Sequence, residues 1–130
     1  MTPKIIYMIA CFYGGTGVIL GAFGAHFLKE KLSLEQLDSF KTGVYYQFFH
    51  ALLLLFIGVQ TEKSAGIWLT SSGYLIIVGI AFFSGSIYLL STKDILGIQS
   101  WKWLGPITPL GGSLMILSWF SLIIYFAKSK

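Results

Sequence analysis

The spacing of charged residues constrains this chain more than any other feature of its sequence. The nine lysines and five acidic residues leave four stretches without any charge, of 24, 20, 29 and 25 residues. These stretches are residues 5–28, 42–61, 64–92 and 103–127. A helix needs about 20 mostly apolar residues to cross the hydrocarbon core of a bilayer, and backbone groups there must be hydrogen-bonded within the helix. The sequence therefore predicts four transmembrane helices.

The composition favours the same class of protein. Hydrophobic residues make up 55% of the 130 residues and charged residues only 11%, whereas a soluble domain carries about 25% charged residues. We expect an all-α membrane protein with a single domain, residues 1–130, whose four helices form an up-down bundle with short connections. The spans are predicted at about residues 5–28, 42–61, 66–92 and 106–127. Four spans place both termini on the same side of the membrane.

The first connection leaves two structures open. Residues 29–41 hold six of the 14 charges, and Ser33 and Gln36 have the spacing of a capping box, which starts a helix. The segment 33–44 is therefore either a short amphipathic helix at the membrane interface or the first turns of the second span. Four lysines lie at the end with the termini and five at the opposite end, so the positive-inside rule predicts no orientation.

Small residues form one face of the first span. Gly14, Gly17, Gly21 and Gly24 follow one another at intervals of three and four residues. Because lipid offers little hydrophobic drive for helix association, small residues promote it by letting two backbones approach closely. We expect these helix-packing glycines to form the buried seam of the first span. A contact between two copies of the chain is the alternative use of this face.

Hydrogen-bonding side chains gather in the half of the bundle that lies away from the termini. Counted inward from that end, His50 and Ser84 each lie eight residues deep, and Tyr46 and Tyr88 each lie four residues deep. We expect Gln47, His50, Ser84 and Tyr88 to form one hydrogen-bonded cluster between the second and third spans, with Tyr46 beside it. Secondary candidates in the same half are His26, Thr108, Gly111 and Gly112.

Two roles are open for this polar cluster. Interhelical hydrogen bonds are the structural interpretation. A small polar pocket is the functional one, because ionisable residues at membrane depth often mark a ligand site or an ion pathway. His26 and His50 also raise the question of haem, which would need two histidines at one depth. Their depths differ by about 8 Å at 1.5 Å per residue, so we predict no cofactor and no metal.

Other classes of function find little support in the sequence. All five acidic residues lie in the connections, and no catalytic motif is present. We therefore predict that the protein is not an enzyme. The basic residues are all lysines near the helix ends, and arginine, which reads base edges and phosphates, is absent. Nucleic acid is therefore not expected as a partner.

Four sequence blocks resemble a known family. They are Gly-Ala-Phe-Gly-Ala-His at 21–26, Thr-Gly-Val-Tyr-Tyr-Gln-Phe-Phe-His-Ala at 42–51, Phe-Ser-Gly-Ser at 83–86 and Gly-Pro-Ile-Thr-Pro-Leu-Gly-Gly at 105–112. This order is similar to a family of small membrane proteins of unknown function, which includes bacterial inner-membrane proteins and a eukaryotic transmembrane relative. The resemblance implies a four-helix multi-pass fold in the cell (inner) membrane. It implies no activity, cofactor or catalytic residue.

These observations favour a non-enzymatic structural or accessory component of the membrane. Its expected partners are the lipid bilayer and either another membrane protein or further copies of itself. One alternative is an oligomeric transporter or channel component for a small molecule or ion, which would use a polar pocket at His50 and Ser84. A further alternative is a redox component that binds haem or quinone.

Overall fold

Long helices carry all four uncharged stretches in the computed structural model, which describes residues 1–129. They are α1 (Pro3–Ala25), α2 (Leu34–Lys63), α3 (Ile67–Ser91) and α5 (Ile107–Lys128). Three short helices lie in the connections: η1 (Leu28–Glu30), α4 (Lys93–Leu96) and η2 (Lys102–Leu104). Within the described residues there is no strand, and each of the four long helices is long and apolar enough to cross a membrane. The predicted all-α transmembrane fold is confirmed.

The start of α2 decides between the two structures that were open for segment 33–44. The Ser33 hydroxyl accepts a hydrogen bond from the Gln36 amide at 3.2 Å, and the Gln36 side-chain carbonyl accepts one from the Ser33 amide at 3.0 Å. This capping box satisfies amides that would otherwise lack a partner. From there α2 continues without a break to Lys63. The segment is therefore the first part of α2 and forms no separate interfacial helix.

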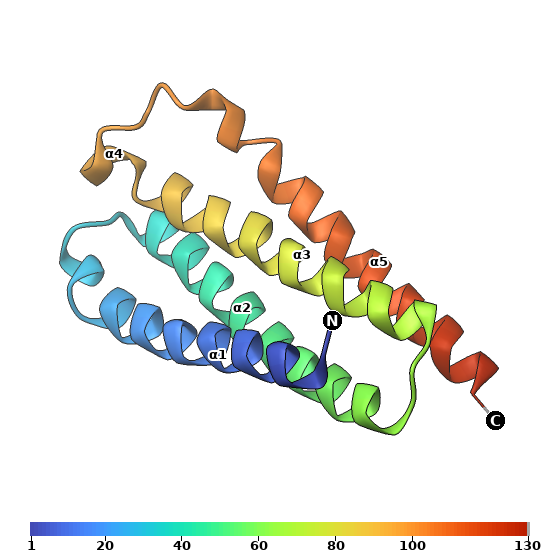
Figure 1. Cartoon of the computed structure of the whole chain (residues 1–130). Helices are drawn as coiled ribbons and strands as arrows, with labels where there is room; N and C mark the ends of the chain where they lie inside the picture. The colour runs from blue at the N-terminus through green and yellow to red at the C-terminus, as the bar shows by residue number, and fades with distance from the viewer. Residues whose placement is uncertain (130) are drawn as a thin grey trace.

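The long helices pack in chain order. Helix α1 lies against α2, α2 against α3, and α3 against α5, and successive helices run in opposite directions (Figure 1). Figure 1 shows both termini at the end that also holds the α2–α3 connection. We call this the terminal end, and the opposite end, which holds η1, α4 and η2, the loop end. The up-down bundle is thus a row, with α1 and α5 at its two margins.

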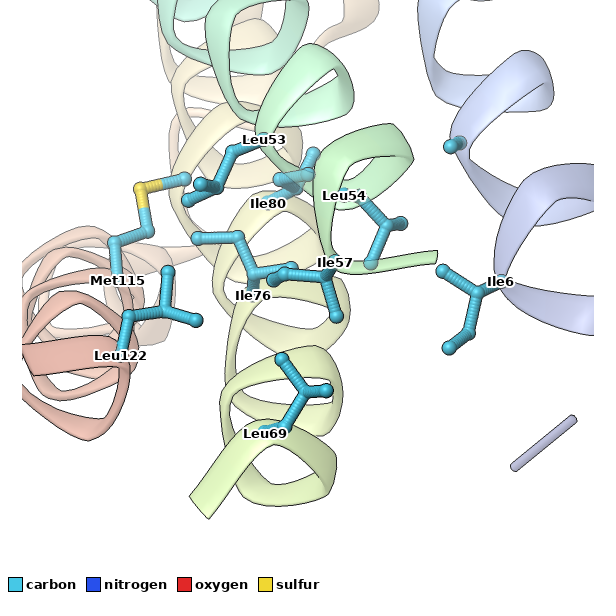
Figure 2. Close-up of a cluster of buried hydrophobic side chains, with 10 residues drawn as sticks. Ile6, Leu53, Leu54, Ile57, Leu69, Ile76, Ile80, Met115 and Leu122 are labelled. Atoms are coloured by element: carbon cyan, nitrogen blue, oxygen red, sulfur yellow. The ribbon is translucent and has the colours of Figure 1, made fainter. Parts of the chain in front are cut away.

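Apolar side chains fill the interior of the row between α1 and α5 (Figure 2). Leu54 and Ile57 of α2 and Ile76 of α3 are fully enclosed. The other members of this core cluster are Ile6, Ala10, Leu53, Leu69, Ile80, Met115 and Leu122. A smaller cluster of Leu28, Leu37 and Phe40 closes the loop end between α2 and η1. In lipid, these contacts stabilise the fold through dispersion and close packing.

Glycines allow the closest backbone approach, which lies between α3 and α5. A Cβ atom at Gly111 would overlap the backbone of Phe83, and a Cβ at Gly79 would lie 2.9 Å from the Met115 side chain. Real Cβ atoms essentially never come this close to a neighbour. Helices α3 and α5 can therefore keep their present separation only with glycine at position 111.

The glycine face of α1 packs on α2 over only part of its predicted length. Gly17 and Gly24 are buried, and Cβ atoms there would lie 3.5 Å from Gln47 and 3.0 Å from Phe40. Gly21 is half-buried, and its Cβ would meet Val44 at 3.4 Å. The prediction for Gly14 is wrong, because no atom lies within 4 Å of its Cβ position.

The geometry of two packed helices explains the difference. The buried positions Ala10, Gly17 and Gly24 repeat every seven residues, which is the interval at which a helix returns to the same side of a partner in left-handed packing. Gly14 and Gly21 lie four residues after members of this series and are therefore displaced to one side of the contact line. Only Gly21 still reaches a neighbour.

Two glycine-to-alanine substitutions test this packing. Gly111→Ala should lower the free energy of unfolding by about 1–3 kcal/mol, because its methyl group forces α3 and α5 apart. Gly14→Ala, the matched control, should be neutral or stabilising by up to about 1 kcal/mol, because alanine favours the helix over glycine. Denaturant unfolding in detergent micelles measures both. Equal losses in the two variants would contradict the assigned contact.

Candidate functional site

Gln47 joins three helices through hydrogen bonds. It lies in the middle of α2 and is only 4% exposed. Its side-chain amide donates to the Tyr13 carbonyl and to the Thr16 hydroxyl of α1, each at 2.8 Å. Its side-chain carbonyl accepts a hydrogen bond from the Tyr88 hydroxyl of α3 at 2.7 Å. Both ends of the Gln47 amide are therefore engaged by neighbouring helices.

A further hydrogen bond joins α1 directly to α3. The Tyr13 hydroxyl donates to the Ile77 carbonyl at 2.9 Å. Helix α1 packs on α2, so this bond reaches the next helix of the row. We call Tyr13, Thr16, Gln47 and Tyr88 the Gln47 cluster. It fixes the rotation of α1, α2 and α3 about their axes, because each bond requires its own pair of faces to meet.

His50 has partners on α2 and α5. Its Nδ1 lies 2.7 Å from the Tyr46 carbonyl, which can only accept a hydrogen bond, so Nδ1 carries the proton. The other ring nitrogen, Nε2, then accepts a hydrogen bond from the indole N–H of Trp119 at 3.3 Å. The Tyr46 ring is half exposed and packs against Phe83 of α3 with a centroid separation of 4.7 Å. Both nitrogens of neutral His50 are thus occupied by protein groups.

The structure corrects the prediction of a single cluster of Gln47, His50, Ser84 and Tyr88. Gln47 and Tyr88 do meet, and the Ser84 hydroxyl also joins α3 to α2 by donating to the Gly43 carbonyl at 2.7 Å, but His50 bonds to α5. Two side chains that are three residues apart on a helix point in directions about 60° apart around the helix axis. That rotation turns Gln47 toward α1 and α3 and His50 toward α5.

The partners that sequence reasoning missed are Tyr13, Thr16 and Trp119. Equal depth pairs side chains of the second span with those of the third, because a short connection makes these two spans neighbours, and it does not single out Tyr13 or Thr16. Tyr13 and Thr16 flank the glycine face of α1, and this position was the available signal. For Trp119 no signal existed, because nothing in the sequence indicates that a side chain of α5 reaches past α3 to α2.

The secondary candidates separate into different contacts. Thr108 forms a hydrogen bond with the Ser86 hydroxyl at 2.6 Å, which ties the start of α5 to α3. Gly111 forms the close contact with Phe83, and Gly112 lies beside it. His26 is exposed where α1 ends, so it does not approach His50. Across residues 1–129, no group of three or more His, Cys, Asp or Glu side chains could hold a metal ion.

The cavity beside His50 is apolar in character. It has a volume of about 340 Å³, and Phe83, Met115 and Trp119 form part of its wall with His50. An apolar depression of about 580 Å³ continues from Trp119 toward Phe126 between α2 and α5. Ser84 does not line this cavity. A polar pocket formed jointly by His50 and Ser84 is therefore not what the structure contains.

Substitutions in the Gln47 cluster should show its contribution to stability. Tyr88→Phe removes one interhelical hydrogen bond and should cost about 0.6–1.7 kcal/mol, and Gln47→Leu should cost more because three bonds are lost. The double variant should lose less than the sum of the two, because both remove the same Tyr88–Gln47 bond. Tyr45→Phe, at a ring that is 60% exposed, is the control and should change nothing. Strict additivity of the two losses would argue against the bond.

Four long apolar helices joined by buried hydrogen bonds define a small multi-pass membrane protein. The chain belongs to the family described as "Protein of unknown function (DUF423)", which matches residues 20–112. This confirms the resemblance seen in the sequence. The matched region extends from the second half of α1 to the start of α5 and includes Gln47, His50, Ser84 and Gly111.

Relatives of known sequence carry membrane-protein names. The chain is 38% identical over 126 residues to the UPF0382 membrane protein YwdK of Bacillus subtilis, covering 96% of this chain and 98% of the relative. It is 40% identical over 121 residues to the UPF0382 membrane protein SAB0533 of Staphylococcus aureus, covering 93% of each. It is 31% identical over 130 residues to the UPF0382 inner membrane protein YgdD of Escherichia coli, covering 100% of this chain and 95% of the relative. No solved structure matches the chain.

Proposed function

We propose that this multi-pass membrane protein is a non-enzymatic accessory component, which acts by binding another membrane component. The observation that carries the proposal is the bonding of His50 and Gln47. Both nitrogens of His50 are hydrogen-bonded within the protein, one to α2 itself and one to α5, and both ends of the Gln47 amide bond to neighbouring helices. A general acid or base must reach a substrate proton. These two side chains instead hold the helices together.

Binding rather than transport also fits the arrangement of the helices. The row packs α1 on α2, α2 on α3 and α3 on α5, and its interior is filled by apolar side chains such as Leu54 and Ile76. Neither the structure of residues 1–129 nor the comparisons support the transporter or redox alternatives. The proposed partner is a membrane protein or a further copy of this chain.

Native mass spectrometry of the protein released from its own membrane tests this function. We expect a membrane protein, or a further copy, bound in a fixed stoichiometric ratio. His50→Leu should lower the melting temperature and leave the complex intact wherever the variant is folded, because His50 serves packing. A wild-type chain that is released alone under conditions that preserve other membrane complexes would contradict the proposal.

We also propose that both termini face the same side of the membrane, since they lie at one end of four antiparallel helices. After Cys11→Ala removes the natural thiol, Thr2→Cys and Ser129→Cys each introduce one reporter at the terminal end, and Ser100→Cys introduces one at the loop end. A membrane-impermeant thiol reagent should label the first two from one side and the third from the other. Labelling of Thr2→Cys and Ser129→Cys from opposite sides would refute this topology.

A further inference from the structure

Apolar side chains are exposed along the connection between α3 and α5, outside the helices that span the membrane. This connection comprises residues 92–106 and holds the short helices α4 and η2. Its large apolar side chains are each between 43% and 58% exposed, and they are Ile95, Leu96, Trp101 and Trp103. Exposed apolar residues that occur together mark a surface that contacts a membrane or another protein. The connection therefore presents such a surface at the loop end.

Ile95 and Leu96 of α4 continue the lipid-facing surface of α1. Together with Phe23 and Phe27 they line an apolar groove of about 310 Å³. The Phe23 and Phe27 rings stack with a centroid separation of 4.9 Å, and about half of each side chain is exposed. The Lys31 ammonium group lies 5.0 Å from the centroid of the Phe27 ring. Because lysines at the ends of spanning helices reach the headgroup level, the groove leads from the lipid-facing side of α1 up to that level.

The lengths of the helices place the connection in the headgroup layer. Helix α3 has 25 residues and is about 37 Å long, whereas the hydrocarbon core is about 30 Å thick. When α3 is centred in the membrane, Ser91 lies about 4 Å outside the core, and α4 begins two residues after it. Helix α2 has 30 residues and is about 45 Å long, so its first turns extend further into water. Glu35 and Asp38 in those turns are exposed, as this position requires.

The residues of the connection also suit this depth. The exposed rings of Trp101 and Trp103 stack with a centroid separation of 5.6 Å, and tryptophan is enriched where the bilayer meets water. Lys93 and Lys102 are exposed beside the apolar residues, and lysines near a membrane surface attract anionic lipid headgroups. Because this surface lies at headgroup depth and continues a lipid-facing groove, the bilayer is the partner that fits it.

We propose that residues 92–106 lie in the headgroup layer of the membrane and insert their four exposed apolar side chains among the lipids. Polar residues of the connection, such as Ser100, face the water. The connection thereby anchors the α3 and α5 side of the loop end, while the first turns of α2 remain in water. The Gln36 side chain joins these two parts by donating to the Asp94 carboxylate at 2.8 Å. This surface is additional to the accessory function proposed above and does not depend on it.

Spin labels in phosphatidylcholine vesicles test this placement. A nitroxide label is attached to Leu96→Cys after Cys11→Ala removes the natural thiol, and electron paramagnetic resonance measures its collisions with oxygen, which concentrates in lipid, and with a water-soluble nickel complex. Oxygen should collide more often with this label than with one at Leu34→Cys, and the nickel complex less often. Leu34 is the matched control, because it is also an exposed leucine at the loop end but lies in the first turn of α2.

A label on the natural Cys11, which is exposed within the span of α1, gives the value expected in lipid. Two results at position 96 would overturn the proposal. Nickel accessibility equal to that at position 34 would place the connection in water. Shielding from both oxygen and nickel would place it against protein, which in these vesicles is a second copy of the chain.

Tryptophan fluorescence gives an independent measurement without a label. Trp68→Phe combined with Trp119→Phe leaves Trp101 and Trp103 as the emitting residues. Their emission should be shifted to shorter wavelength than that of tryptophan in water, and lipids brominated near the headgroup should quench it more than lipids brominated near the chain end. Circular dichroism checks that each variant is folded. Stronger quenching by iodide in the water than by either lipid would refute the insertion.

Discussion

Helix association in this protein depends on the fact that lipid tails are as apolar as the side chains they surround. Burial of leucine against leucine therefore gains little by removal from solvent, and what remains is close backbone packing and interhelical hydrogen bonding. Gly111 supplies the first between α3 and α5, and Gln47 supplies the second among α1, α2 and α3. Both devices involve α3, so together they connect the whole row.

The fold could be predicted from the sequence because it depends on the lengths of the uncharged stretches and on their spacing along the chain. Uncharged length decides which segments cross a bilayer, and the short interval between the second and third uncharged stretches makes α2 and α3 neighbours. The polar site depends on rotation instead. Equal depth correctly predicted that Gln47 and Tyr88 meet. It did not predict that His50, which points about 60° away from Gln47 around the axis of α2, bonds to α5 instead. The same kind of rotation distinguishes Gly17, which is buried, from Gly14.

A polar cleft of about 730 Å³ at the loop end could not be predicted from the sequence. Its wall combines residues from three helix ends and from the four-residue helix α4, and no single segment carries a recognisable motif for it. Ser91 reads in the sequence as an ordinary helical serine. Only its position in the structure shows that its hydroxyl lacks a partner among the described residues, while Gln36 and Gln99 hold the nearby Asp94 carboxylate in place.

The packing of the helices in chain order has a consequence for biosynthesis. Each long helix makes its main backbone contact with the helix that precedes or follows it in the chain. Each helix can therefore pack as soon as the helix that follows it in the chain has entered the membrane, and its packing does not depend on a segment that is made much later. Contacts of this local kind carry a small loop-closure cost and favour rapid folding. The chain can thus assemble stepwise during synthesis, as an α1–α2 hairpin to which α3 and then α5 are added.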